Sequence, residues 1–144
     1  MRMVIGCGND ARGDDAAGLL VARRLRQLGV HAVERPGEAT DLIEAFAGAE
    51  DVTVVDAVVT GARPGAIHLW KDTPPPLPPA ATGSSHGMGI AEAIALAGAL
   101  GRLPRRLRVY GIEAARLGLG SRVSPEVLAA VEAVAQEIAG VGAG

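Results

Sequence analysis

The opening of the chain constrains the fold most, because a short apolar strand runs into a loop rich in glycine and aspartate and then into an apolar helix. The strand is expected over Met1–Ile5 and the loop over 6–18. Glycines let a backbone turn sharply after a strand, or let another group approach it closely. Asp10, Asp14 and Asp15 all lie in this turn, which predicts a site for a cation or for a partner that carries one.

The helix after this loop is expected to begin with Asp14 as its N-cap and Asp15 in its first turn. Carboxylates suit both positions, because they accept free backbone N–H groups and face the positive end of the helix dipole. Leucines then recur at helical spacing, and Gly29 suits the residue just after the last turn.

Strands and helices alternate along the rest of the chain. Further strands are expected over 31–34, 52–55, 66–70 and 107–111, and further helices over 40–48, from about 87 to 100, and from Ser124 to about Gly140. The strand over 52–55 is apolar on both faces, as a central parallel strand should be. The proline-rich stretch 73–79 is expected to be a stiff surface loop.

This alternation predicts an α/β fold: a three-layer sandwich in which a mainly parallel, twisted, five-stranded sheet is flanked by helices on both faces. The 144 residues are expected to form a single domain over 1–144. Aromatic residues make up only 2% of the chain, so the core must be aliphatic.

Composition also excludes several classes of function. A net charge of -2, without basic stretches interleaved with aromatic rings, argues against nucleic-acid binding. No apolar run is long enough to span a membrane, and the first apolar run is too short for a signal peptide. The single cysteine suits a reducing compartment, so we expect a cytoplasmic protein, and we expect it to be a monomer.

In folds of this class the functional site lies at the carboxyl ends of the strands, and that rule selects Asp15, Asp56 and His86. Two carboxylates and an imidazole suit a divalent transition metal such as Ni, Zn, Mn or Cd, with positions left open. The same three residues also suit general acid–base chemistry.

Each of these three residues has a structural interpretation as well. Asp15 also suits a helix start, and His86 a hydrogen bond to the backbone at a helix entry. Asp56 ends a buried strand, where an acid without a function is costly. Cys7 is interpreted as a small packed hydrophobe, and His31 and His68 as structural or exposed.

Two other classes of function remain open. The stretch 6–11 fits G-x-G-x-x-A, and Glu34 stands where a ribose-binding acid would be, as in dinucleotide-binding proteins. The acids of the loop would repel a pyrophosphate, and the helix does not begin at the third small residue, so this hypothesis is weaker. A metal-binding module without chemistry of its own would need the same ligands as an enzyme.

Four motifs, in this order, resemble those of the hydrogenase maturation proteases. They are Gly6-x-Gly8-Asn9-x-x-x-Gly13-Asp14-Asp15-x-x-Gly18; Val54-Val55-Asp56-Ala57-Val58 with Gly61 and Pro64-Gly65; Ser85-His86-x-x-Gly89; and Gly111-Ile112-Glu113 with Ser124-Pro125-Glu126. Each motif is weak alone, but the ordered set is specific and runs through nearly the whole chain.

The resemblance implies an endopeptidase that removes the C-terminal extension from the precursor of a nickel–iron hydrogenase large subunit after nickel insertion. It implies that Asp15, Asp56 and His86 contact nickel held by the substrate, so that the metal is the recognition signal, and that no organic cofactor is needed. It also implies that Asp15 or Asp56 positions or activates water, while His86 completes the metal contact.

Overall fold

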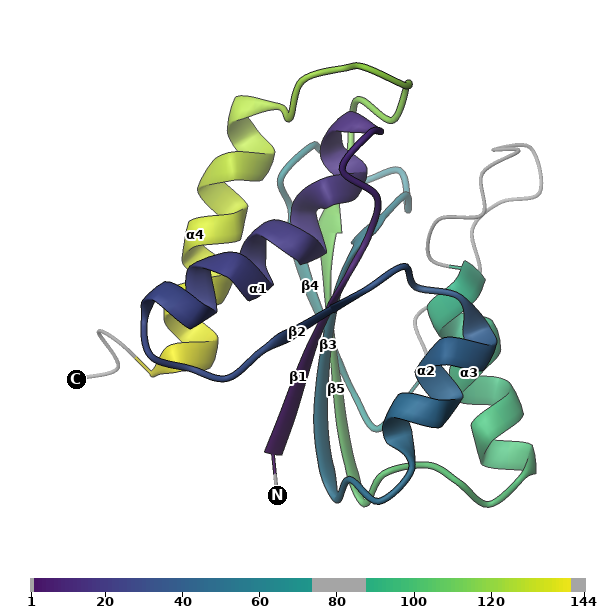
Figure 1. The fold of residues 1–144 in the computed structure, drawn as a ribbon. Helices are drawn as coiled ribbons and strands as arrows, with labels where there is room; N and C mark the ends of the chain where they lie inside the picture. Colours follow the sequence, from purple (N-terminus) through teal and green to yellow (C-terminus); the bar gives the residue numbers. More distant parts are fainter. Residues whose placement is uncertain (1, 74–87, 141–144) are drawn as a thin grey trace.

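A five-stranded sheet forms the middle layer of the protein in the computed structural model, which describes residues 2–73 and 88–140 (Figure 1). The strand order is β2-β1-β3-β5-β4. The strands are β1 (Arg2–Cys7), β2 (Val33–Arg35), β3 (Asp51–Val58), β4 (Ile67–Lys71) and β5 (Arg106–Glu113). All neighbouring pairs are parallel except β4 and β5. The expected mainly parallel sheet is therefore confirmed, with one antiparallel edge strand.

Helices cover both faces of this sheet. The helices are the short 3₁₀ helix η1 (Gly13–Ala16), α1 (Ala17–Gln27), α2 (Ala39–Phe46), α3 (Met88–Ala99) and α4 (Pro125–Ala139). Figure 1 shows α1 and α4 on one side of the sheet and α2 and α3 on the other. The predicted three-layer sandwich is confirmed.

Within the described ranges, no helix combines the length and apolar character needed to cross a membrane.

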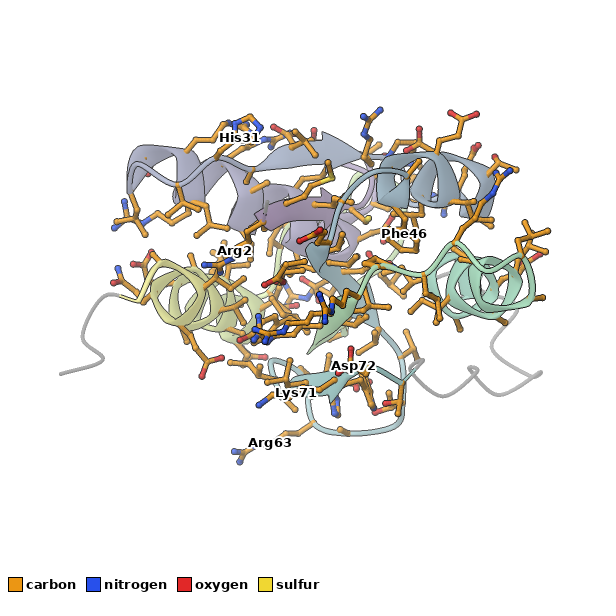
Figure 2. The ribbon with its side chains drawn as sticks, turned by 90° about the horizontal axis from the view of Figure 1, so that it is seen from below. Arg2, His31, Phe46, Arg63, Lys71 and Asp72 are labelled. Atoms are coloured by element: carbon orange, nitrogen blue, oxygen red, sulfur yellow. The ribbon has the colours of Figure 1, made fainter. Side chains whose placement is uncertain are left out.

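The two interfaces between helices and sheet hold two largely aliphatic cores. On one face, Leu25 of α1 and Val134 of α4 pack over the sheet. On the other face, Leu42 and Phe46 of α2 pack with Ile94 of α3, and Figure 2 shows Phe46 between its helix and the sheet. Burying aliphatic side chains in this way supplies most of the driving force for folding.

Several boundaries differ from the sequence-based expectations. The ladder between β3 and β5 continues to the pair Val58–Glu113, so Asp56 lies two residues before the end of its strand rather than at the end. The helix expected over 40–48 begins and ends slightly earlier, over Ala39–Phe46, with Glu38 at the N-cap position. By contrast, α4 begins after Ser124 and ends at Gly140 as predicted.

The first turn of α1 touches the backbone of the sheet directly. A β-carbon at Gly18 would lie 2.2 Å from the carbonyl oxygens of both Cys7 and Val55. A β-carbon at Gly6 would lie 2.1 Å from the carbonyl oxygen of Gly18. Only glycines permit such a close crossing of helix and strands. This crossing places the η1 segment over the carboxyl ends of β1 and β3.

Candidate functional site

Two buried carboxylates, Asp15 of η1 and Asp56 of β3, lie at the carboxyl edge of the sheet. Asp15 is 5% exposed and Asp56 is 7% exposed. The pKa of Asp56 is raised well above its ordinary value, first by burial and then by the negative charge of Asp15. One hydrogen bond, from the Ala57 N–H at 2.8 Å, partly supports the Asp56 carboxylate. Two buried acids this close to each other favour a proton or a cation between them.

Glycine and asparagine in the first loop place Asp15 there. A β-carbon at Gly8 would lie 2.0 Å from the carbonyl oxygen of Asp15, so only glycine lets the end of β1 approach η1. The Asn9 N–H donates to the same carbonyl oxygen at 3.3 Å. The Asn9 side chain accepts a hydrogen bond from the Ala11 N–H at 2.9 Å, which closes the turn.

The prediction that Asp14 caps the following helix is wrong. Asp14 is fully buried, and its carboxylate accepts hydrogen bonds from the N–H groups of Ala115, Arg116 and Ser124 and from the Ser124 hydroxyl. Burial acts to raise the pKa of Asp14, but these hydrogen bonds outweigh it and lower the pKa. The side chain ties the first loop to the segment before α4, a contact that local sequence patterns do not reveal.

Cys7 lies beside the acidic pair without the character of a nucleophile. Burial raises the pKa of its thiol well above the ordinary value, and the charges of Asp56, Asp41 and Asp15 raise it further. A thiol that stays protonated is a poor nucleophile and a poor metal ligand. The expectation that Cys7 packs as a small hydrophobe is confirmed by its place in the core.

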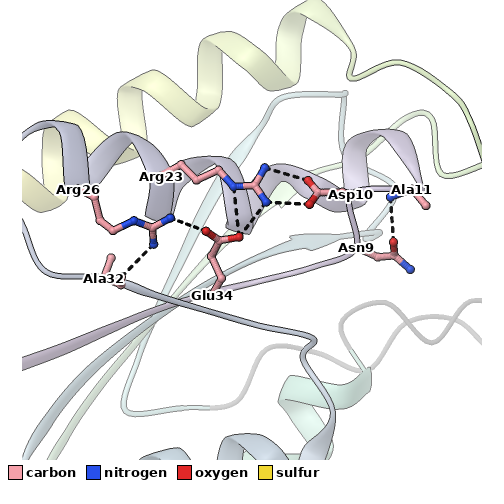
Figure 3. A network of polar contacts seen from close by, with 7 residues as sticks. All are labelled: Asn9, Asp10, Ala11, Arg23, Arg26, Ala32 and Glu34. Atoms are coloured by element: carbon pink, nitrogen blue, oxygen red, sulfur yellow. Dashed lines mark hydrogen bonds and ion pairs between the residues drawn. The ribbon is translucent and has the colours of Figure 1, made fainter.

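The third acid of the loop, Asp10, is exposed and belongs to a surface network with Arg23 and Glu34 (Figure 3). Arg23 donates to both oxygens of Asp10, at 2.9 and 2.7 Å, and to Glu34 at 2.8 Å. Arg26 pairs with the other oxygen of Glu34 and donates to the Ala32 carbonyl oxygen. Two arginines thus hold the carboxylate that a dinucleotide-binding protein would use for ribose.

His86, the third predicted site residue, lies outside the described residues, so its approach to Asp15 and Asp56 stays a prediction. Within 2–73 and 88–140, no cluster of three or more histidine, cysteine, aspartate and glutamate side chains could hold a metal ion. The described part of the chain therefore supplies at most an incomplete set of ligands.

Of the other histidines, His31 is exposed (Figure 2), and His68 is partly exposed and paired with Glu113.

A further buried acid, which was not among the site residues predicted from the sequence, lies at the same edge. Glu113, the last residue of β5, is 1% exposed and contacts Thr60 and His68. The signal was available, because Glu113 ends an apolar strand just as Asp56 stands near the end of β3. The motif Gly111-Ile112-Glu113 was used only as part of the family resemblance, and no site role was predicted for Glu113.

The fold and the acidic edge define a three-layer α/β protein with a carboxylate site at the carboxyl ends of its parallel strands. A family model described as "HycI: Hydrogenase maturation protease" matches residues 24–141. The chain therefore belongs to the hydrogenase maturation protease family and is a peptidase. A search among curated proteins found no match.

Solved structures of this family share the fold. The hydrogenase maturating endopeptidase HybD of Escherichia coli is 21% identical, with a TM-score of 0.78 over 95% of this chain and 88% of that chain. The HycI protease of Thermococcus kodakarensis is 26% identical, with a TM-score of 0.73 over 99% and 92%. A hydrogenase 2 maturation peptidase from a Thaumarchaeota archaeon is 22% identical, with a TM-score of 0.66 over 97% and 98%.

Proposed function

We propose that this chain removes the C-terminal extension from the precursor of a nickel–iron hydrogenase large subunit after nickel insertion, and that nickel held by the precursor is the recognition signal. The observation that carries the proposal is the buried pair of Asp15 and Asp56, in which burial and the second acid raise the pKa of Asp56. A substrate that brings a divalent cation to this pair offsets the electrostatic cost.

This arrangement explains how the protein would distinguish precursors. A precursor without nickel brings no positive charge, so docking would bury two carboxylates in a protein interface without a cation from the substrate, which is costly. With Asp15, Asp56 and His86 as the only contacts from this chain, the ion keeps positions open for thiolates of the substrate. Such a site binds free metal weakly and substrate-held metal well.

The residues have proposed roles in hydrolysis as well. Asp15 or Asp56 positions or activates the attacking water, and His86 completes the contact with the substrate's nickel. A carboxylate with a raised pKa is a stronger base than an ordinary one, so Asp56 suits proton abstraction from water once it has lost its own proton. No organic cofactor is required. We further propose that the protein works in the cytoplasm as a monomer.

The two alternative functions fit less well. Dinucleotide binding would need the carboxylate of Glu34, which Arg23 and Arg26 hold. A binding module without chemistry would need the same acidic pair, but the family to which the chain belongs consists of proteases. An assay for peptide cleavage distinguishes the two, because a binding module would not cleave the precursor.

The test is incubation of the purified protein with a nickel-loaded precursor, the same precursor without nickel, and casein. We expect cleavage of the nickel-loaded precursor alone. Single changes Asp15→Asn, Asp56→Asn and His86→Ala should lower the cleavage rate by about 100-fold or more while the circular dichroism spectrum is unchanged. The matched control is Asp10→Asn, which removes an exposed acid from the same loop and should leave the rate unchanged. Equal cleavage of the nickel-free precursor, or efficient cleavage of casein, contradicts the proposal.

A further inference from the structure

Glu113 is a buried carboxylate that the proposed contact with nickel does not use. It lies at the carboxyl edge of the sheet, where Asp56 stands opposite Gly111 and Val58 stands opposite Glu113. Residues two apart on a strand share a face, so Glu113 and Asp56 lie on the same face of the sheet. A buried carboxylate is costly without partners, and its partners therefore indicate its role.

The partners of the Glu113 side chain come from the segment that follows β3 and from β4. The Thr60 N–H donates to one carboxylate oxygen at 2.8 Å, and the Thr60 hydroxyl donates to the other at 2.6 Å. His68 Nε2 lies 3.1 Å from that second oxygen. Both oxygens are therefore satisfied by groups outside β5, which makes Glu113 a fixed anchor.

The backbone of Glu113 holds the far end of the same segment. The Gly65 N–H donates to the Glu113 carbonyl oxygen at 2.8 Å, and the Glu113 N–H donates to the Ala66 carbonyl oxygen at 2.9 Å. One residue thus fixes both ends of the loop between β3 and β4, residues 59–66. Residues 60–64 of this loop are exposed, and Figure 2 shows Arg63 pointing away from the sheet.

The imidazole ring of His68 is held next to this loop and remains 25% exposed. Trp70 stacks on it, with ring centroids 5.3 Å apart and planes 14° apart. Gly111 of β5 lies between Asp56 of β3 and His68 of β4, because it is the register partner of both. A β-carbon at Gly111 would lie 2.7 Å from the Trp70 ring. The glycine therefore provides the space for the ring pair beside Asp56.

We propose that Glu113 is a positioning residue, which holds the loop 59–66 and the His68 ring as one wall of the site that receives the substrate peptide. The inference rests on the proposed function. Two strand spacings separate Asp56 from His68, so their Cα atoms are about 10 Å apart. An extended peptide covers that distance in about three residues. A precursor whose metal meets Asp56 and whose chain runs toward β4 therefore reaches this wall within a few residues of the metal.

The test compares Glu113→Gln with Glu126→Gln, an exposed acid in the first turn of α4 beside the same loop. Glutamine keeps the size of Glu113 but removes its charge and replaces one acceptor oxygen with a donor NH₂ group, so the Thr60 hydroxyl can no longer donate to that atom and the charge-assisted hydrogen bonds are lost. We expect Glu113→Gln to raise the KM for nickel-loaded precursor about ten-fold with kcat nearly unchanged. We also expect amide hydrogen exchange at Thr60 to quicken about ten-fold or more. The control variant should change neither quantity.

Three results would overturn the inference. An unchanged KM in Glu113→Gln, with normal cleavage by the unmodified protein, contradicts the inference alone, and so does a fall in kcat at unchanged KM. Failure of the unmodified protein to cleave any nickel-loaded precursor contradicts the proposed function and this inference together. If Glu113→Gln does not fold, Thr60→Val removes the hydroxyl contacts with Glu113 and with the Ala62 N–H, keeps the Thr60 N–H bond to Glu113, and should raise the KM by a smaller factor.

Discussion

At the scale of single residues, Asp14 and Asp56 are buried carboxylates whose surroundings act in opposite directions. Asp14 accepts hydrogen bonds from Ala115, Arg116 and Ser124, and these lower its pKa although burial opposes them. Among the described residues, the Ala57 N–H donates to Asp56, and burial and the charge of Asp15 raise its pKa. The first acid stabilises the fold in its charged form, whereas the second makes the folded state less stable when it is charged.

We therefore expect Asp14→Asn and Asp56→Asn to have opposite effects on the free energy of unfolding, measured with urea in EDTA. At pH 8, Asp14→Asn should lose about 3 kcal/mol, because an amide cannot accept all the bonds that Asp14 accepts. Asp56→Asn should gain on the order of 1 kcal/mol, because it removes a charge that the folded state disfavours.

The two acids should also change the stability of the protein with pH in opposite directions. The folded pKa of Asp56 is raised, so its contribution is most favourable below the unfolded pKa of about 4 and is lost as the pH rises through the folded value. The advantage of Asp56→Asn should therefore shrink between pH 8 and pH 4.5. The folded pKa of Asp14 is lowered, so its stabilisation is present above about pH 4 and is lost as the pH falls further. A loss of stability in Asp56→Asn at pH 8 would contradict this account.

At the scale of elements, the crossing of α1 over β1 and β3 positions Asp15 above the strand ends. Gly18 allows this crossing, since a β-carbon there would lie 2.2 Å from carbonyl oxygens of both strands. These oxygens belong to backbone, which cannot move aside as a flexible side chain could. Backbone contact at Gly18, rather than interdigitated side chains, therefore sets the position of the first turn of α1 on the sheet.

Gly18→Ala should lower the free energy of unfolding by about 3 kcal/mol or more, because the helix must lift from the sheet to admit one methyl group. The matched control is Gly118→Ala, since a β-carbon at Gly118 meets no atom within 4 Å. The control should stay within about 0.5 kcal/mol of the unmodified protein. Similar stability for the two variants, measured by urea unfolding, would show that the crossing is looser than described.

At the scale of the whole molecule, one sheet joins the two cores, and α4 closes the fold over the segment that begins the chain. Asp14 bonds to Ser124 across 110 residues of sequence, and Arg24 of α1 pairs with Glu132 of α4. Neither core has a sheet of its own, so loss of β3 or β5 exposes both. Such an arrangement favours a single cooperative unit.

We expect thermal unfolding to be two-state for this reason. Trp70, the only tryptophan, packs against the core beneath α2 and α3, so its fluorescence reports on that face. Far-UV circular dichroism reports on the helices of both faces, including α1 and α4 of the face opposite Trp70. The two transitions should have the same midpoint. Midpoints that differ by several degrees would indicate two independently unfolding parts and contradict the single domain.

The sequence by itself determined the elements and their alternation, because the hydrophobic period and the helix-terminating residues act locally. Gly29 and Gly140 follow the ends of α1 and α4, both in left-handed conformation, as their positions predicted. The alternation of strands and helices then fixed a mainly parallel sheet covered on both faces. The acid near the end of β3 was also visible locally, because a carboxylate is unusual in so apolar a strand.

Only the tertiary structure decided what the acids do, because their partners are distant in sequence. Asp14, whose position suited a helix cap, meets donors more than 100 residues away. Glu113 acts on Thr60, 53 residues earlier, and no local pattern encodes that pairing. The ionisation of Asp56 likewise depends on how deeply the sheet buries it and on how closely η1 brings Asp15. These are properties of packing, which residue type and spacing leave open.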